Sequence, residues 1–386
     1  MTKIDLDELV ENLMQCRRCG ICRDAVYEEK GFDGVCPVWK SSAGFETNFM
    51  RGRIQVALAL LDGTLEKTAE NAEALFTCTL CGNCTEICAA EFDPAECLEK
   101  VRAVMRDIPN EVRDTITERV MHYDNPYDDN KHLKRDWVKE VGFEIPAKGE
   151  ILYFTGCTSS MRLPNVAVST ARILKAAHID FAVLENESCC GSLMLRTGMT
   201  VEAERNARKL VESIRSSGAK KILVTCAGCL KTLREDYPKL GFNLPETLHV
   251  TEELQAIVRG RKLKLNSLGK GLRITYHDPC HLSGKLSIYD EPREIIMAIP
   301  EIELVEMQTT RETAMCCGAG GGLRSYDPEL SKKIAADRVR SAEHVKADMI
   351  ATSCPFCEHN LKAGAELTRS TIRIVDVVEL LAESIE

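Results

Sequence analysis

The sequence predicts an α/β fold for two repeated units in the C-terminal part of the chain, preceded by a mainly helical module. The first observation is a repeat: from Ile151 onward, short apolar strand patterns alternate with helical patterns, and the series occurs twice. The second is the distribution of the 19 cysteines, of which ten fall in the repeat and nine before residue 108. The third is size, because 386 residues with 44% hydrophobic content suffice for two or three domains.

The N-terminal module is expected to span residues 1–108. It combines short turns with amphipathic helical stretches, as in residues 51–61, where apolar residues recur at helical spacing. Residues 109–148 contain no cysteine and are rich in charge, so we interpret them as a connector. Turn-forming residues near both ends of this connector flank a predicted helix at residues 131–141.

The repeat divides the rest of the chain into units at residues 149–262 and 263–386. In each unit a lone cysteine, a Cys-Cys-Gly and a Cys-x-x-Cys occur in the same order. Cys280 follows Cys157 by 123 residues, and the later cysteines are offset by 127 or 128 residues, so we interpret the units as a duplication. Functional loops gather at the carboxyl ends of strands in open α/β sheets. We therefore expect four cysteines, each of which follows an apolar run, at strand ends: Cys157, Cys226, Cys280 and Cys354.

The composition argues against several partners and compartments. The net charge of -9 and the pI near 5.6 argue against nucleic acid, or an anionic membrane, as the main partner. No apolar run is long enough to span a membrane, and residues 1–13 lack the pattern of a secretory signal. The sequence therefore predicts no direct membrane span. It predicts a cytoplasmic protein, or one attached to a membrane through a partner.

The cysteines indicate either a disulfide framework or metal ligation. Ligation is favoured because the chain is long enough for its own core and shows no secretory signal. The odd cysteine count and the repeated Cys-x-x-Cys spacings point the same way.

The N-terminal cysteines resemble those of two-cluster bacterial ferredoxins. One group has the complete C-x2-C-x2-C-x3-C spacing and the other begins it: Cys78, Cys81, Cys84 and Cys88, and Cys16, Cys19 and Cys22 with Cys36 further along. In such ferredoxins the fourth cysteine binds the other cluster. The resemblance therefore implies a ferredoxin-type module with two cubane [4Fe-4S] clusters. Their ligands would be Cys16, Cys19, Cys22 and Cys88 for one cluster, and Cys36, Cys78, Cys81 and Cys84 for the other.

The chain departs from the ferredoxin pattern between Cys22 and Cys36, where 13 residues stand instead of the usual three. We interpret the difference as an insertion. Two zinc sites are the alternative, but zinc would not need three cysteines spaced by two and then a Cys-Pro. Cys97 lies in a helical pattern and is expected to be a buried small residue, not a ligand.

Each C-terminal unit offers five cysteines, more than one tetrahedral ion binds. The two sets are Cys157, Cys189, Cys190, Cys226 and Cys229, and Cys280, Cys316, Cys317, Cys354 and Cys357. Their spacing resembles the cysteine-rich CCG domain, which occurs twice in the catalytic subunits of heterodisulfide reductases. The whole order, a ferredoxin module followed by two such domains, is similar to the D-type subunits of the membrane-linked heterodisulfide reductases of methanogens. Related proteins include iron–sulfur subunits of glycolate, lactate and glycerol-3-phosphate dehydrogenases.

This resemblance implies a noncubane [4Fe-4S] cluster on each five-cysteine motif, with a disulfide substrate between the two. Some relatives place zinc in the first copy, so zinc is an alternative there. The implied function is reduction of a small disulfide, such as the coenzyme M–coenzyme B heterodisulfide. Its electrons would come from a partner subunit, which is a membrane cytochrome b-like protein, a soluble flavoprotein or a hydrogenase. The ten motif cysteines would be catalytic together with His281, which would donate a proton or a hydrogen bond to a departing thiolate, or support a cluster sulfide.

The competing hypothesis is a relay. The chain would then be the iron–sulfur subunit of a flavin-dependent 2-hydroxy acid or glycerol-3-phosphate dehydrogenase complex. Both five-cysteine motifs are complete, which favours disulfide reduction. The glycine-rich segment 318–322 lacks the pattern of a nucleotide-binding loop and is predicted to bring bare backbone close to the second noncubane cluster.

Overall fold

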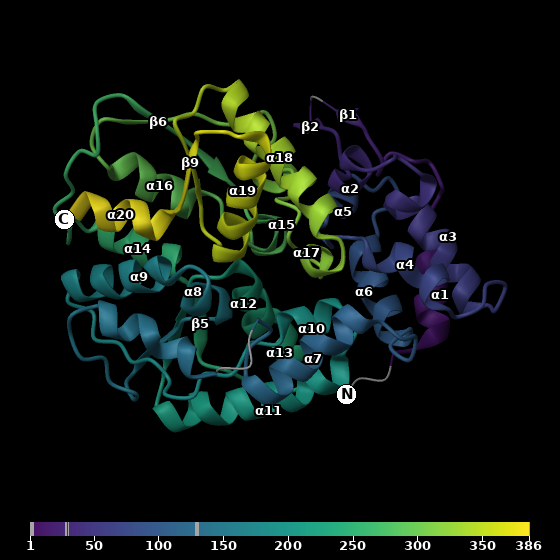
Figure 1. Cartoon of the computed structure of the whole chain (residues 1–386), viewed down its shortest axis with the longest axis horizontal. Coiled ribbons are helices and arrows are strands. Elements are labelled where there is room, and N and C mark those ends of the chain that lie inside the picture. Colours follow the sequence, from purple (N-terminus) through teal and green to yellow (C-terminus); the bar gives the residue numbers. More distant parts are fainter. Residues whose placement is uncertain (1–3, 28, 30, 128–130, 386) are drawn as a thin grey trace.

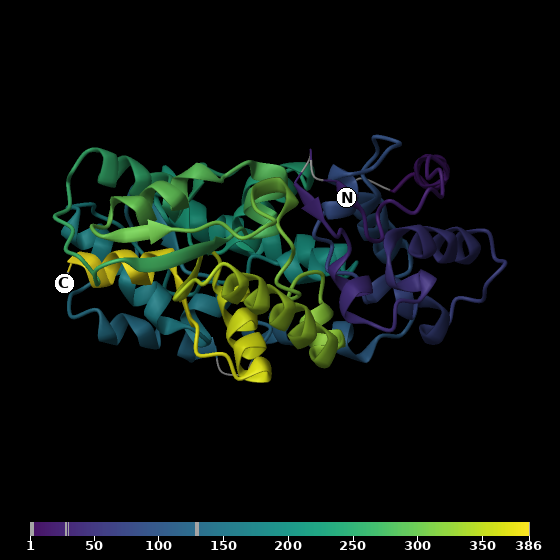
Figure 2. The ribbon, with the colours of Figure 1, turned by 90° about the horizontal axis from the view of Figure 1, so that it is seen from above.

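The computed structural model describes residues 4–27, 29, 31–127 and 131–385. The two C-terminal units lie one above the other in Figure 1, and the N-terminal module lies at one end of both. The view from above (Figure 2) again places this module and the C-terminus at opposite ends. Among the described residues, no helix combines the length and the apolar character that a membrane crossing requires.

The N-terminal module is mainly helical, as predicted. Its elements are α1 (Leu6–Met14), β1 (Val26–Tyr27), β2 (Phe32–Asp33), α2 (Pro37–Ser41), η2 (Glu46–Asn48), α3 (Met50–Leu61), α4 (Ala69–Phe76), α5 (Asn83–Glu86) and α6 (Pro94–Val104). Strands β1 and β2 pair antiparallel. Apolar side chains of α1, α3 and α6 share one core, to which Leu9, Ile54 and Leu98 belong.

The segment expected to be a connector contains α7 (Glu111–Tyr123) and η3 (Lys131–Glu140). The predicted helix at residues 131–141 is present, but as a 3₁₀-helix. Its Trp137 is buried and packs edge-on against Tyr153, with ring centroids 5.9 Å apart. The segment therefore contributes to the core of the first repeated unit.

The first repeated unit contains a three-stranded parallel sheet. Its strands, in spatial order, are β3 (Ile151–Phe154), β4 (Lys221–Val224) and β5 (Glu246–His249). Its helices are α8 (Cys157–Met161), α9 (Pro164–Ala176), α10 (Ser192–Arg196), α11 (Thr200–Ser217), α12 (Ala227–Lys231), the π-helix η4 (Thr232–Asp236), α13 (Tyr237–Lys239) and α14 (Val250–Arg259). The last three residues of β3 and of β4 are buried, which is typical of strands covered on both faces.

The second unit contains a four-stranded parallel sheet. Its strands, in spatial order, are β7 (Ile302–Leu304), β6 (Leu272–His277), β8 (Met349–Thr352) and β9 (Arg373–Asp376). Its helices are α15 (Cys280–Leu286), α16 (Asp290–Ala298), η5 (Arg311–Thr313), α17 (Leu323–Tyr326), α18 (Pro328–His344), α19 (Pro355–Thr368) and α20 (Val377–Ile385). Where this unit has β7, the first has a single parallel bridge between Leu152 and Ala182. The two units therefore share one topology, and the predicted α/β fold is confirmed.

Local sequence signals explain the alternation of helices and strands. Helix α11 buries apolar residues at helical spacing, among them Ala203, Ala207, Leu210 and Ile214. It ends at Ser217, because Gly218 adopts the left-handed conformation (φ +78°) that closes a helix and that other residues adopt only at a cost. Strand β4 begins three residues later, as the apolar run after this glycine predicts.

Arg102 joins the N-terminal module to both repeated units. Its side chain is fully buried, and its guanidinium donates hydrogen bonds to four backbone carbonyls: Leu75 at 2.7 Å, and Cys78, Arg196 and Gly321 at 2.8 Å each. Leu75 and Cys78 belong to the N-terminal module, Arg196 to the first unit and Gly321 to the second. One side chain therefore holds three parts of the molecule together.

Candidate functional site

The cysteines of both repeated units surround one cavity of about 120 Å³. Cys157 and Cys280 begin helices directly after β3 and β6, while Cys226 and Cys354 lie two residues beyond β4 and β8. Cys226 and Cys354 line the same cavity, and each thiol shifts the pKa of the other, so the two units meet at this point. All ten motif cysteines line the cavity: Cys157, Cys189, Cys190, Cys226, Cys229, Cys280, Cys316, Cys317, Cys354 and Cys357.

Each motif gathers its own sulfur atoms. In the first unit the Sγ atoms of Cys190 and Cys229 are 3.2 Å apart. The equivalent atoms of Cys317 and Cys357 in the second unit are 3.3 Å apart. The Cys-Cys pair of each unit is thus folded back onto its Cys-x-x-Cys loop, which the sequence separation alone does not require.

A glycine after each Cys-Cys pair shapes the loop. Gly191 and Gly318 both have left-handed backbone, with φ of +81° and +87°. In this conformation their amides donate to the Sγ atoms of Cys189 and Cys316, at 3.4 Å each. Hydrogen bonds of this kind stabilise a thiolate, the form in which cysteine binds metal.

One asparagine in each unit holds the Cys-Cys loop in place. Asn206 donates to the carbonyl of Cys189, and Asn360 donates to the carbonyl of Cys317, both at 2.6 Å. Both asparagines are buried. Each unit thus uses a buried asparagine, but Asn206 lies on α11 and binds the first cysteine of its pair, whereas Asn360 lies on α19 and binds the second.

Replacement of Asn360 by leucine is expected to lower the free energy of unfolding by about 1–3 kcal/mol, because the buried carbonyl of Cys317 loses its donor. Asn206→Leu should have a similar effect on the first unit. Asn71→Leu, at a more exposed asparagine that donates to Glu66, is the control and should change stability by no more than about 0.5 kcal/mol. Anaerobic denaturant unfolding of the three variants checks this, and equal midpoints for all three would contradict it.

The N-terminal cysteines line two smaller cavities, of about 30 and 20 Å³. The first is lined by Cys16, Cys19, Cys22 and Cys88 together with Cys84. The second is lined by Cys36, Cys78, Cys81 and Cys84 together with Cys22. Each predicted ligand set thus surrounds one cavity. Cys97 is buried in the core and lines neither of these cavities.

The insertion between Cys22 and Cys36 contains the strands β1 and β2. Because these strands run antiparallel, the chain returns to its starting point. The amide of Cys36 donates to the carbonyl of Arg23 at 3.0 Å, which closes the insertion at its base. The longer spacing therefore leaves Cys36 within reach of the second ligand set.

The N-terminal module faces the second repeated unit through its cysteine loop. Cys81 packs against the core that contains Cys316, and this neighbouring thiol raises the pKa of Cys81. A Cβ atom on Gly321 would collide with the carbonyl of Cys78, and one on Gly320 would lie 2.7 Å from the carbonyl of Thr79. Because they lack a Cβ atom, these two glycines let the backbone of the second unit pack closely against the backbone of the N-terminal module. The sequence did not predict this contact.

The cysteines are free thiols, and all 19 lie within the described residues. Burial raises the pKa of Cys22 and Cys36 to about 11, and that of Cys84 well above its usual value. Metal ligation requires thiolates, so binding at these sites must release protons, and the metal charge must offset the desolvation. Buried, unpaired thiols gathered in sets fit metal ligation and not a disulfide framework.

Lys134, which the sequence did not single out, lies beside the first motif. This buried ammonium donates to the carbonyl of Glu187 at 2.6 Å, while the Glu187 carboxylate accepts from the amides of Thr155 and Gly156, at 2.8 and 2.9 Å. Burial alone would lower the pKa of Lys134, but the neighbouring side chains of Cys157 and Glu187 raise it. No sequence signal could have found this lysine, because its segment carries no motif.

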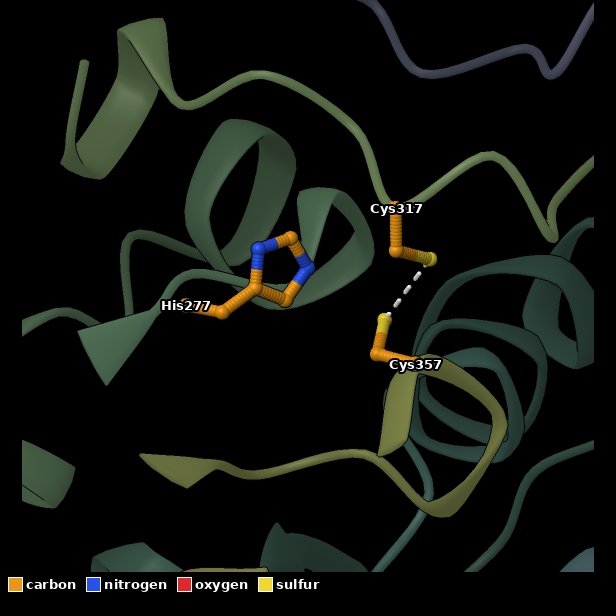
Figure 3. A group of neighbouring side chains, drawn as sticks. All are labelled: His277, Cys317 and Cys357. Carbon is orange, nitrogen blue, oxygen red and sulfur yellow. Dashed lines mark hydrogen bonds between the residues drawn. The ribbon is translucent and has the colours of Figure 1, made fainter. Parts of the chain in front are cut away.

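His277 was also not predicted, and it lies beside the second motif (Figure 3). A ring nitrogen of His277 and the Sγ atoms of Cys317 and Cys357 lie within 4.8 Å of one another. Burial, and then the charge of Arg338, lower the pKa of this histidine to about 3, so the ring is neutral. Comparison of the two copies could have indicated it, because the histidine occurs in only one of them.

His281, which the sequence did predict, lines the cavity beside Cys280. A second cavity of about 330 Å³ lies between the N-terminal module and the first unit. His281 and Arg196 line both cavities, which are therefore neighbours. The Arg196 guanidinium is paired with the carboxylates of Glu99 and Asp236, so its charge is already balanced.

Two family models match the chain. A cysteine-rich domain model matches residues 151–234 and again residues 274–362, in agreement with the duplication. A 4Fe-4S dicluster domain model matches residues 12–92. Together the matched ranges contain all eighteen cysteines predicted to bind metal. These are the cysteines that line the three cavities described above.

Several curated proteins are similar to the chain over most of its length. A subunit of the dihydromethanophenazine:CoB–CoM heterodisulfide reductase of Methanosarcina barkeri is 37% identical, over 80% of this chain and 77% of that protein. A subunit of the fumarate reductase (CoM/CoB) of Methanothermobacter marburgensis is 32% identical, over 90% and 69%. The EtfAB:quinone oxidoreductase of Syntrophomonas wolfei is 30% identical, over 82% of this chain and 47% of that protein.

Proposed function

Because this chain belongs to the family of the D-type subunits of heterodisulfide reductases, we propose that it reduces a small disulfide in the cavity that its ten motif cysteines line. The chain is an iron–sulfur oxidoreductase subunit. The observation that carries the finer proposal is that two complete five-cysteine motifs share a single cavity wall. A substrate between them would touch both motifs at once.

The residues fit a noncubane [4Fe-4S] cluster in each unit. Soft thiolates are the ligands that iron–sulfur clusters use, and five thiols on each side exceed what one tetrahedral ion needs. The ligands would be Cys157, Cys189, Cys190, Cys226 and Cys229 on one side, and Cys280, Cys316, Cys317, Cys354 and Cys357 on the other. When bound, the pair would supply the two electrons that cleavage of a disulfide requires.

The rest of the cavity wall determines how a substrate is held. Leu193, Pro279 and Phe356 supply apolar surface beside the cysteines and exclude water. Tyr127 also lines the cavity and shares a hydrogen bond of 2.7 Å with Thr158. Burial raises the pKa of Tyr127, so its hydroxyl stays protonated. The site thus offers the substrate apolar contact together with polar groups, among them the neutral hydroxyl of Tyr127.

His281 is the proposed proton donor. Reduction of a disulfide to two thiols consumes two electrons and two protons, and a histidine in the cavity wall can deliver one of the protons to a departing thiolate. The same side chain lines the larger neighbouring cavity, which we propose as the route of entry for the substrate. The coenzyme M–coenzyme B heterodisulfide is the proposed substrate class, because two relatives carry this coenzyme pair in their names.

We propose that electrons enter at the ligand set that contains Cys19, because Cys19 is exposed and a partner subunit can approach it. They would leave from the set that contains Cys81, because Cys81 lies beside Cys316 of the second motif. Both sets fit cubane [4Fe-4S] clusters, since each surrounds one small cavity. The electron donor would be a cytochrome b-like protein, a flavoprotein or a hydrogenase.

Metal analysis and electron paramagnetic resonance of the anaerobically purified protein test the proposal. Four clusters of four irons give roughly sixteen iron atoms per chain. Oxidation in the presence of coenzyme M or coenzyme B thiol should give a paramagnetic signal that is absent without thiol. Buffer without thiol, and a thiol too bulky for the cavity, are the controls.

The relay hypothesis predicts a different result. Iron near eight atoms per chain, zinc in the repeated units and no thiol-dependent signal would mean that only the N-terminal clusters are redox-active. The chain would then pass electrons between a flavin-dependent partner and another carrier, and disulfide reduction would be wrong. The similarity to an EtfAB:quinone oxidoreductase is the observation that favours this alternative.

A further inference from the structure

His277 has a ring nitrogen without a hydrogen-bond partner among the described residues, and this nitrogen lies beside the cysteines of the second motif. Its side chain is fully buried, and within the part of the chain that the structure describes its Nε2 atom has no hydrogen-bond partner. The ring edge that carries Nε2 faces the sulfur atoms of Cys317 and Cys357 (Figure 3). A buried polar atom without a partner is rare in a native protein and indicates a missing partner.

Arg338 determines which ring nitrogen carries the proton. The Arg338 guanidinium donates through Nε to Nδ1 of His277 at 3.3 Å, and its other nitrogens donate to the hydroxyl and the carbonyl of Thr309, at 3.0 and 2.9 Å. Arginine has no acceptor, so Nδ1 must supply the lone pair. The ring proton is therefore on Nε2. Nε2 cannot be a metal ligand in this tautomer, and it points a donor at the two sulfurs.

The first unit has no donor at the position that corresponds to His277. His277 pairs with Thr352 across its sheet, and Phe154 pairs in the same way with Val224. Both stand three residues before the first cysteine of their motif, so Phe154 occupies the position of His277. The two units are offset by 127 or 128 residues in this region, so Arg338 corresponds to Val211 or Leu210 of α11. Both of these residues are apolar and buried. The second unit thus contains a polar pair where the first contains only core.

His277 is separated from the substrate cavity. Cys317 and Cys357 line that cavity, whereas His277 is not among its lining residues. The histidine therefore lies behind the sulfurs and does not touch a substrate, in contrast to His281. Because it does not touch a substrate, His277 can act only through the sulfur atoms of Cys317 and Cys357.

We propose that His277 is a positioning residue that donates its Nε2–H to the Cys317 or Cys357 sulfur of a cluster on the second motif, and that it raises the reduction potential of that cluster. This inference rests on the proposed function. A hydrogen bond to a cluster sulfur stabilises the more negative, reduced state, so the reduction is favoured without transfer of the proton. The cluster gains one electron, and the histidine stays neutral.

The asymmetry has a consequence for the reaction. The two motifs face one substrate, and the second lies beside the N-terminal module, where Cys316 neighbours Cys81. A higher potential on the second motif would make it the first acceptor of electrons from that module. The donor thus occurs in the unit at which electrons would arrive.

The test is a redox titration, followed by electron paramagnetic resonance, of the full-length anaerobic protein in a Cys190→Ser background, where the second motif gives the remaining noncubane signal. His277→Phe copies the residue of the first unit. We expect unchanged iron content and a roughly tenfold less favourable one-electron reduction, which corresponds to a potential about 59 mV lower. His277→Gln keeps an N–H donor and should restore part of the shift. Tyr276→Phe, on the same strand and the opposite face of the sheet, is the matched control and should leave the potential unchanged.

Each result is decisive. A lower potential with iron retained, and partial recovery in His277→Gln, supports the inference. Loss of about four iron atoms per chain in His277→Phe would make the histidine a ligand and overturn it. Retained iron with an unchanged potential would overturn it while leaving the proposed function intact. A wild-type chain without iron on the second motif would overturn both.

Discussion

Replacement of Arg102 by methionine is expected to lower the free energy of unfolding by at least about 4 kcal/mol. Four buried carbonyls lose their donor, and each such loss costs roughly 1 kcal/mol or more. Methionine fills similar volume, so the expected loss comes from hydrogen bonds and not from a cavity. Because the carbonyls belong to three parts of the chain, the variant should weaken both the contact of the N-terminal module with the first unit and its contact with the second unit. Anaerobic thermal unfolding, together with limited proteolysis between the parts, measures the effect.

Arg106→Met is the matched control for this prediction. Arg106 also bridges the N-terminal module and the first unit, through an ion pair of 3.0 Å with Glu202, but its side chain is partly exposed. Exposed ion pairs contribute about 0–1 kcal/mol, so this variant should melt close to the wild type. Arg102→Lys keeps the charge without the planar fork of donors and should fall between the two. Equal melting of Arg102→Met and Arg106→Met would show that the four carbonyls find other partners.

Replacement of Cys317 by serine is expected to abolish the proposed cluster of the second repeated unit and to reduce the proposed disulfide-reducing activity to background. Cys317 lies 3.3 Å from Cys357 and lines the shared cavity, so its loss removes a ligand from the centre of the motif. The N-terminal ligand sets surround separate cavities and should keep their clusters. Iron should therefore fall by about four atoms per chain, while the ferredoxin-type signals remain.

Two other cysteine variants complete this experiment. Cys97→Ala removes a buried thiol that lines none of the candidate cavities, so iron should stay at the wild-type content. Cys190→Ser removes the equivalent ligand of the first motif, and it distinguishes iron from zinc there by which metal is lost. Loss of every cluster in Cys317→Ser would contradict the separate cavities and would mean that the sites assemble together.

Much of the fold was predictable because its signals are local. Helix α11, its closing Gly218 and the apolar run of β4 lie within a few residues of one another, so the sequence shows each step from helix to strand. The same holds for Cys226 and Cys354, which follow apolar runs and lie just beyond strands. The connector was less predictable, because burial of Trp137 against Tyr153 depends on a contact with a distant strand.

The duplication and the strand-end cysteines follow from the sequence alone, because both are read from spacing and apolar runs along the chain. The grouping of the N-terminal thiols into two sets was implied by the resemblance to two-cluster ferredoxins. Two features became visible only in the folded chain: Cys81 lies beside Cys316, and His277 lies behind the second motif. These contacts join residues far apart in the chain. They depend on how separately formed units pack, and packing between units leaves no periodic signal in either sequence copy.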